Sequence, residues 1–143
     1  VNKVTQPFIA KRQVEFRDTD AAGIMHFSTF ITYMEESEHE LLRSVGLSVM
    51  NCEVDGIHLS WPRVSVNCDF TRPLRFEDEF EIHVIVAKLG GKSATYSFEF
   101  VKDDQTLATG SITAVCCTMA DGKLNGTPIP HSVREKLSIY LKS

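Results

Sequence analysis

HFSTFITYMEESEHELLRSVG, the stretch from His26 to Gly46, predicts one long amphipathic helix. Its apolar residues recur at the three- and four-residue spacing of one helix face, namely Phe27, Phe30, Ile31, Met34, Leu41, Leu42 and Val45. Gly46 is a natural stop because glycine readily takes the left-handed backbone conformation. With a rise of about 1.5 Å per residue, the helix is about 30 Å long. Glu38 interrupts the apolar face, so its carboxylate either lies at the margin or is buried with a partner.

The rest of the chain alternates between apolar and polar residues, which is typical of strands with one buried face. Such runs occupy residues 8–16, 80–86, 94–100 and 107–119. A further run, 57–70, changes phase at Pro62, which predicts a bulge or bend because proline cannot donate a ladder hydrogen bond. Residues 89–92 predict a hairpin turn whose two glycines can take positive φ. Residues 130–141 predict a short amphipathic helix whose apolar side chains are partly buried, namely Val133, Leu137, Ile139 and Tyr140.

Length and composition fit one α+β domain that covers residues 1–143, with a sheet packed on the long helix. The hydrophobic fraction of 43% and the charged fraction of 24% are those of an average globular protein. A formal net charge of −4, without a basic stripe, argues against a nucleic-acid partner. No apolar run is long enough for a membrane span or a signal peptide, so we expect a cytoplasmic protein.

The cysteines and histidines give no sign of a metal or redox site. The four cysteines form no Cys-x-x-Cys pair and no Cys/His zinc pattern. Cys116 and Cys117 are adjacent in a strand-like run, where side chains point to opposite faces, so they are poor disulfide partners. His58, His83 and His131 form no metal-like cluster with Asp or Glu. We expect reduced thiols, no metal and no cofactor.

The segment FRDTDAAGIMHF, residues 16–27, carries the densest chemistry. It places two carboxylates, Asp18 and Asp20, and a small glycine, Gly23, where the first strand ends and the helix begins. A helix N-terminus presents unpaired amides and a partial positive charge, which suit an anion or a developing oxyanion. The residues alone favour a plainer interpretation, in which Asp20 caps the turn and Asp18 is solvated.

The DTDAAG sequence, followed by a hydrophobic pair and a helix that carries an acidic residue, resembles the hotdog-fold acyl-CoA thioesterases, in particular the 4-hydroxybenzoyl-CoA thioesterase branch. The likeness covers nearly all 143 residues, in motif, helix length and strand number. It implies one long helix wrapped by a curved antiparallel sheet of about five strands. It also implies a homodimer whose sheets join edge to edge, active sites at the interface, and pairing of dimers into a homotetramer.

The resemblance further implies an acyl-CoA substrate and a division of catalytic roles. Asp20 matches the catalytic carboxylate, acting either as a nucleophile or as a general base toward water. The backbone N–H of Phe27 matches the donor that polarises the thioester carbonyl. The thiolate leaving group has a pKa near that of cysteine, about 8.5, so this reaction demands neither a metal nor a catalytic triad. The expected substrate-binding residues are Gly23, His26, Trp61 and Lys92.

Two positions depart from the pattern of the family. The Tol-Pal-associated members carry a histidine where Phe27 stands, so we interpret His26 as part of the pocket wall or interface rather than as an acid or base. Lys92 falls where relatives place basic residues on the CoA phosphates, but two glycines replace the arginines that some carry. We therefore expect the protein to make fewer contacts with the nucleotide, or to supply them from elsewhere, for instance from Arg72 or Arg75.

The identity of the acyl group stays open at this point. The candidates for its pocket wall are Ile24, Met25, Phe30, Met34 and Trp61, and such side chains accept aromatic and aliphatic groups alike. Two acidic helix residues have other expected roles: Glu35 is structural, and Glu38 is an ion-pair partner at the interface or a second carboxylate. His39 is expected to be solvated.

Two alternative functions belong to different classes. A hotdog hydratase or dehydratase also uses an Asp and a His near a helix start, although its characteristic Gly-Asp-x-Asn/His-Pro motif is absent here. A non-catalytic acyl-CoA-binding protein is the other alternative, but such domains usually accompany a DNA-binding segment for which this chain has no spare residues. The carrier, CoA or acyl carrier protein, also stays open.

Overall fold

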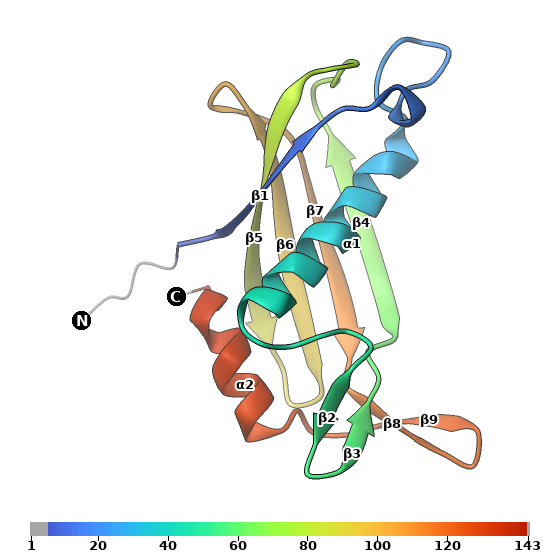
Figure 1. Cartoon of the computed structure of the whole chain (residues 1–143), viewed down its shortest axis with the longest axis vertical. Helices are drawn as coiled ribbons and strands as arrows, with labels where there is room; N and C mark the ends of the chain where they lie inside the picture. The colour runs from blue at the N-terminus through green and yellow to red at the C-terminus, as the bar shows by residue number, and fades with distance from the viewer. Residues whose placement is uncertain (1–5, 143) are drawn as a thin grey trace.

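The computed structural model describes residues 6–142 and shows one long helix, α1, lying across one face of a five-stranded antiparallel sheet (Figure 1). The strand order is β1-β5-β6-β7-β4. The strands are β1 (Phe8–Gln13), β4 (Arg63–Phe70), β5 (Glu79–Leu89), β6 (Ser93–Lys102) and β7 (Gln105–Val115). The predicted α+β arrangement and the number of strands in the sheet are confirmed.

Helix α1 (Phe27–Ser44) begins and ends close to the predicted residues. His26 is its N-cap, since the ring Nδ1 accepts a hydrogen bond from the Ser28 N–H at 3.3 Å. Gly46 has a φ of +81°, a conformation that suits a residue without Cβ just after a helix. Of the predicted apolar residues, Phe30, Met34, Leu41 and Leu42 are buried, together with Tyr33. Phe27 and Ile31, which were expected on the same face, are instead 63% and 38% exposed.

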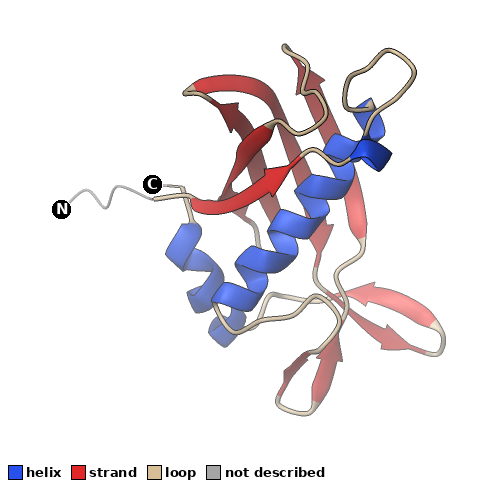
Figure 2. Cartoon of the chain, turned by 45° about the horizontal axis from the view of Figure 1, so that its top comes forward, coloured by secondary structure: helices blue, strands red, loops and turns tan. Residues whose placement is uncertain are grey.

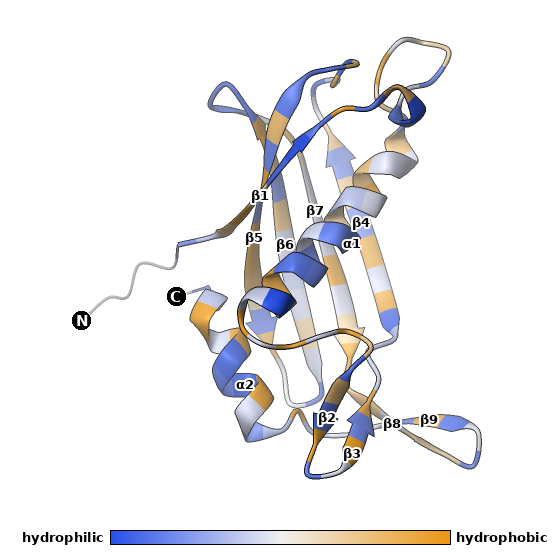
Figure 3. Cartoon of the chain, viewed as in Figure 1, coloured by the Kyte–Doolittle hydropathy of each residue, from blue (hydrophilic) through white to orange (hydrophobic). Residues whose placement is uncertain are grey.

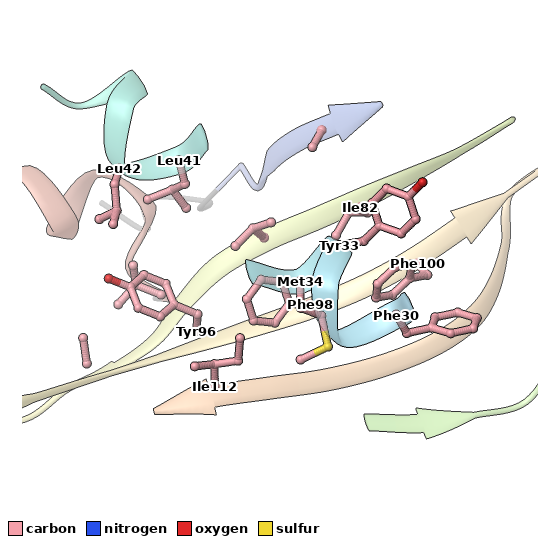
Figure 4. Packing of buried hydrophobic residues seen from close by; sticks show 14 of the residues in the cluster. Phe30, Tyr33, Met34, Leu41, Leu42, Ile82, Tyr96, Phe98, Phe100 and Ile112 are labelled. Carbon is pink, nitrogen blue, oxygen red and sulfur yellow. The ribbon is translucent and has the colours of Figure 1, made fainter. Parts of the chain in front are cut away.

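The core fills the space between α1 and the concave face of the sheet (Figure 4). Phe30 meets Phe100 edge to face, with ring centroids 5.0 Å apart. Met34, one turn further along, packs against Gly110 on β7. A Cβ at position 110 would lie 2.8 Å from the Met34 Cε, so only glycine leaves room for this thioether. The interior of the molecule is therefore closely filled along the middle of the helix.

Two small hairpins project from one end of the sheet (Figure 2). They are formed by β2 (Cys52–Val54) with β3 (Ile57–Leu59), and by β8 (Cys117–Ala120) with β9 (Lys123–Gly126). The predicted strand 57–70 is thus divided at Trp61 and Pro62, where we expected a bend. The predicted strand 107–119 is divided at Cys116, because Cys117 pairs with Ser60 outside the main sheet.

The C-terminal segment forms α2 (His131–Leu137) and a short 3₁₀ turn, η2 (Ser138–Tyr140), as predicted in outline. Three details of the predictions were wrong. Phe16 is 76% exposed in the turn η1 (Phe16–Asp18) instead of lying on the buried face of the first strand. Ile139 is exposed rather than partly buried. The hairpin glycines have negative φ, and Gly90 instead allows close approach of Ser93.

Strand β4 forms one edge of the sheet and is exposed along most of its length. Hydrophobic bands are visible on it in Figure 3, and Val64, Val66 and Phe70 are all more than 40% exposed. An edge strand with exposed apolar residues offers unpaired backbone groups to another strand. Within residues 6–142, no helix is long and apolar enough to cross a membrane.

Candidate active site

A cavity of about 460 Å³ opens at the N-terminal end of α1. The loop before the helix, the first helical turns and the segment after β4 form its walls. The lining is mostly apolar and includes one carboxylate and one guanidinium. The lining residues are Asp20, Ile24, Met25, Phe27, Phe30, Phe70, Thr71, Arg72 and Pro73.

Asp20 is held in a tight turn within the loop that joins η1 to α1. Its Oδ1 accepts a hydrogen bond from the Ala22 N–H at 2.8 Å, and its backbone N–H donates to the Ile24 carbonyl at 3.0 Å. The second carboxylate oxygen, Oδ2, accepts no hydrogen bond from residues 6–142. The turn therefore fixes one oxygen of Asp20 and leaves the other available at a half-buried position in the cavity wall.

The helix N-terminus carries a backbone donor at Phe27, a residue that lines the same cavity. Phe27 is the first residue of α1, and its N–H has no partner among residues 6–142. Such N–H groups carry the positive end of the helix dipole. The Ser28 N–H donates to the His26 Nδ1 at 3.3 Å, and the Ser28 hydroxyl lies 2.8 Å from the same nitrogen. The capping function thus belongs to His26, and we found no sequence signal for it, since histidine is an uncommon N-cap.

None of the four predicted substrate-binding residues lines the cavity: Gly23 and His26 lie close to Asp20 in the chain, and Trp61 and Lys92 lie far from it. Gly23 lies in the loop with Asp20, with a φ of +79° and no atom within 4 Å of a Cβ built on it. Trp61 lies between β3 and β4, and Lys92 lies in the turn between β5 and β6, where its carbonyl accepts a hydrogen bond from the Cys116 N–H next to β8. Both segments are at the end of the sheet that carries the two hairpins (Figure 1). Strand β4 separates Trp61 from the cavity by eight residues, about 26 Å. A single chain therefore does not bring Trp61 or Lys92 to Asp20.

The basic residues expected near CoA also separate. Arg72 lines the cavity, whereas Arg75 does not. Neither forms an ion pair within residues 6–142. Arg72 follows directly after β4, where the backbone N–H groups of residues 71 and 72 both donate to the Leu107 carbonyl. Its position at the mouth of an apolar cavity leaves one unpaired cation available to an anionic ligand.

Sequence reasoning identified part of the cavity wall. Ile24, Met25 and Phe30 line it, but Met34 is fully buried behind it in the core. The segment Phe70–Pro73 was missed as a wall, although a strand that ends in Thr-Arg-Pro is a signal for a loop beside the sheet edge. The ring of Phe70 meets Phe30 edge to face, with centroids 5.0 Å apart, so the two aromatic residues form one surface.

The expectation that Asp18 is solvated was wrong. Asp18 is only 8% exposed, and its Oδ2 accepts a hydrogen bond from the Tyr33 hydroxyl at 2.6 Å. The same oxygen accepts from the Glu15 N–H at 2.9 Å. The carboxylate is thus buried against the helix because two donors compensate the loss of water. Asp18 does not line the cavity that contains Asp20.

Glu38 is fully buried and forms an ion pair within the same chain. Its Oε2 lies 2.6 Å from the Arg63 Nη2, whereas Oε1 has no hydrogen-bond partner. Burial raises the pKa of Glu38 from 4.5 to about 7, against the opposing effect of Arg63. His39 is partly buried beside Arg63, not solvated, and burial lowers its pKa. The pair joins α1 to β4 at the end of the helix away from Asp20.

No group of three His, Cys, Asp or Glu side chains within residues 6–142 is arranged to hold a metal ion. All four cysteines are free. Burial raises the pKa of the Cys68 and Cys116 thiols to about 11, so both stay protonated at neutral pH.

Comparison with known proteins identifies the family to which the chain belongs. The family model of the thioesterase-like superfamily matches residues 14–137. A 1,4-dihydroxy-2-naphthoyl-CoA hydrolase from Synechococcus sp. (strain WH7803) is 29% identical over 126 residues, which cover 82% of this chain and 80% of that protein.

Two solved structures extend the comparison to the fold. A hypothetical protein from Aquifex aeolicus superposes with a TM-score of 0.79 at 32% identity, covering 92% of this chain and 99% of that one. A gentisyl-coenzyme A thioesterase superposes with a TM-score of 0.76 at 28% identity, covering 90% and 98%. The chain belongs to the thioesterase-like superfamily of hotdog-fold proteins, and it is a thioester hydrolase.

Proposed function

We propose that this protein hydrolyses an aromatic acyl-CoA thioester to the free acid and CoA, with Asp20 and the Phe27 N–H as its catalytic groups. The observation that carries the proposal is that Asp20 and Phe27 line one apolar cavity at the N-terminus of α1. The cavity pairs a carboxylate that has one free oxygen with a backbone donor that has no partner. Thioester hydrolysis requires both kinds of group.

The Phe27 N–H binds the thioester carbonyl oxygen and stabilises the negative charge that develops there. Removing one such donor from an oxyanion site typically costs about 3–4 kcal/mol of transition-state stabilisation. The free oxygen of Asp20 then either attacks the carbonyl carbon or removes a proton from an attacking water. In both routes the C–S bond breaks and CoA leaves as a thiolate, which is a stable leaving group. After direct attack, water hydrolyses the resulting anhydride, which releases the acid and restores the Asp20 carboxylate.

Aromatic side chains support an aromatic acyl group. Phe27, Phe30 and Phe70 line the cavity, and Phe30 with Phe70 presents an edge-to-face pair. Such rings favour another ring in an offset or edge-on arrangement. Two of the compared proteins carry the names of thioesterases for aromatic acyl-CoA compounds, dihydroxynaphthoyl-CoA and gentisyl-CoA. The interior behind Phe30 is filled by Met34, so a long aliphatic chain has no straight path inward.

We further propose a homodimer in which two β4 edges pair across a twofold axis. The exposed residues Val64, Val66 and Phe70 supply the apolar contact, and two strands related by such an axis run antiparallel. The start of β4 in one subunit then lies beside the end of β4 in the other. Trp61 of the partner subunit is thereby carried toward Phe70 and the cavity of this subunit.

The same symmetry gives Lys92 a role. Lys92 lies at the same end of the sheet as Trp61, so Lys92 of the partner subunit approaches the mouth of the cavity where Arg72 is unpaired. Two cations at the mouth suit the phosphates of CoA. Pairing of dimers into a homotetramer remains part of the proposal, and so does a cytoplasmic location.

The proposal is tested by incubating the purified protein with a panel of acyl-CoA thioesters and a thiol reagent. The panel contains benzoyl, phenylacetyl, dihydroxynaphthoyl and straight-chain acyl groups. We expect release of free CoA, fastest from the aromatic members. Loss of enoyl absorbance without free thiol would instead identify a hydratase, and tight binding without either signal a non-catalytic binder. Fastest turnover of long straight chains would refute the aromatic assignment.

A further inference from the structure

Asp18 connects the loop that carries Asp20 to the body of helix α1. Besides the two hydrogen bonds to its carboxylate, its backbone carbonyl accepts from the His26 N–H at 2.8 Å and from the Thr29 hydroxyl at 3.4 Å. A β-bridge between Thr19 and Met25 lies directly next to this point. Both ends of the loop of residues 19–25 are therefore held together next to Asp18.

The two proposed catalytic groups lie very close to this position in the chain. Asp20 is two residues after Asp18, and the Phe27 N–H is one residue after His26. A shift of Asp18 relative to the helix would move the Asp20 carboxylate relative to the Phe27 N–H. An error of about 1 Å in such a geometry can lower a rate about a hundredfold.

Tyr33 is a rigid anchor for Asp18. It lies six residues after Phe27 on the same helix, about 9 Å along its axis. Tyr33 is 7% exposed, and its ring meets Phe80 edge to face with centroids 5.4 Å apart. Burial and the Asp18 carboxylate both raise the pKa of Tyr33, so the hydroxyl keeps its proton and acts as a donor.

We propose that the hydrogen bond from Tyr33 to Asp18 positions Asp20 against the helix N-terminus and so sets the rate of thioester hydrolysis. The inference rests on the proposed function, because it assigns Asp20 the catalytic role. Asp18 and Tyr33 do not line the cavity with Asp20; they line a separate, polar hollow on the other side of the loop. Both are therefore positioning residues that act without touching the substrate.

The test compares steady-state kinetics of three variants. Tyr33→Phe removes only the hydroxyl, and we expect kcat to fall about tenfold with KM within about twofold, because substrate contacts are unchanged. Asp18→Ala should behave in the same way. Asp18→Asn should restore kcat to near the wild-type value, because the Asn Oδ1 can accept hydrogen bonds from Tyr33 and from Glu15.

Tyr96→Phe is the matched control. Tyr96 is also a buried tyrosine, 2% exposed, but its hydroxyl lies near Glu38 at the far end of the helix. We expect its kcat to match that of the wild type, whatever the change in melting temperature. A Tyr33→Phe enzyme with wild-type kcat, or with a loss that Tyr96→Phe shares, would overturn the inference.

Asp20→Asn, assayed in parallel, separates the inference from the proposed function. If Asp20→Asn stays active, the proposed function fails at its catalytic residue. If Asp20→Asn loses activity while Tyr33→Phe does not, only the positioning role fails. Adding Tyr33→Phe to Asp20→Asn should cause less than about a twofold further loss, because the hydroxyl acts through Asp20; a full tenfold further loss would contradict this route.

Discussion

Replacing Glu38 by glutamine should change how the stability of the protein depends on pH. Glu38 has a pKa of about 7 in the folded protein, because burial outweighs the Arg63 partner, and 4.5 when exposed. Between pH 4.5 and about pH 7, Glu38 has released its proton in the unfolded chain but still holds it in the folded chain. Stability therefore falls as the pH rises from about 4.5 to about 7, and it is constant above this range with respect to this group.

The magnitude follows from the two pKa values. Each pH unit of difference corresponds to about 1.4 kcal/mol, so the full effect is about 3 kcal/mol. Between pH 5 and pH 8 roughly 2 to 3 kcal/mol of it is observable. Protonated Glu and Gln are similar in shape and charge, so Glu38→Gln should match the wild type near pH 5. At pH 8 it should be more stable than the wild type by this amount.

Urea denaturation of both proteins at several pH values between 5 and 8 measures the difference. The quantity to compare at each pH is the free energy of unfolding of Glu38→Gln minus that of the wild type. Burial also lowers the pKa of His39 below 6.5, and this makes the stability of both proteins rise with pH in the same range. That contribution is common to both proteins. Glu35→Gln is the control, because Glu35 is exposed on the same helix. Parallel stability curves for Glu38→Gln and the wild type would refute the reasoning.

Two further predictions concern assembly and substrate binding. Val66→Lys places a charge on the exposed edge strand β4 and should prevent the two subunits from pairing. In light scattering we expect the mass of two chains for the wild type and of one chain for the variant. A wild-type mass of one chain at micromolar concentration would contradict the dimer. Lys92→Ala should raise KM for acyl-CoA by up to about fivefold with little change in kcat, and leave KM for a pantetheine thioester unchanged. An unchanged KM for acyl-CoA removes Lys92 from the substrate site.

The helix and the sheet were predictable because each rests on a local pattern. The apolar spacing from Phe27 to Val45 and the stop at Gly46 placed α1 within two residues of its observed bounds. The alternation of β5 and β6 gave their buried faces, for instance Ile82 and Val84. The phase change at Pro62 correctly marked the division between β3 and β4.

The details that failed depend on contacts between distant segments. Asp18 was expected in solvent because nothing near it in the sequence indicates the hydroxyl of Tyr33, fifteen residues away. Glu38 stood out as an interruption of the apolar face, but its partner Arg63 lies twenty-five residues later on another element. The cavity wall at Phe70 was missed for the same reason. Trp61 and Lys92 remain predictions, because neither lines the cavity of its own chain and their proposed role depends on the proposed dimer.

The turnover of Asp20→Asn on the best acyl-CoA substrate tests the central claim most directly. Asparagine retains an oxygen that can accept the Ala22 N–H, which lies 2.8 Å from Asp20 Oδ1, so the loop and the melting temperature should be preserved. The change removes the negative charge that nucleophilic attack and base catalysis both require. The account predicts a loss of kcat of at least about a hundredfold in a folded protein. Turnover near the wild-type value would contradict the role of Asp20.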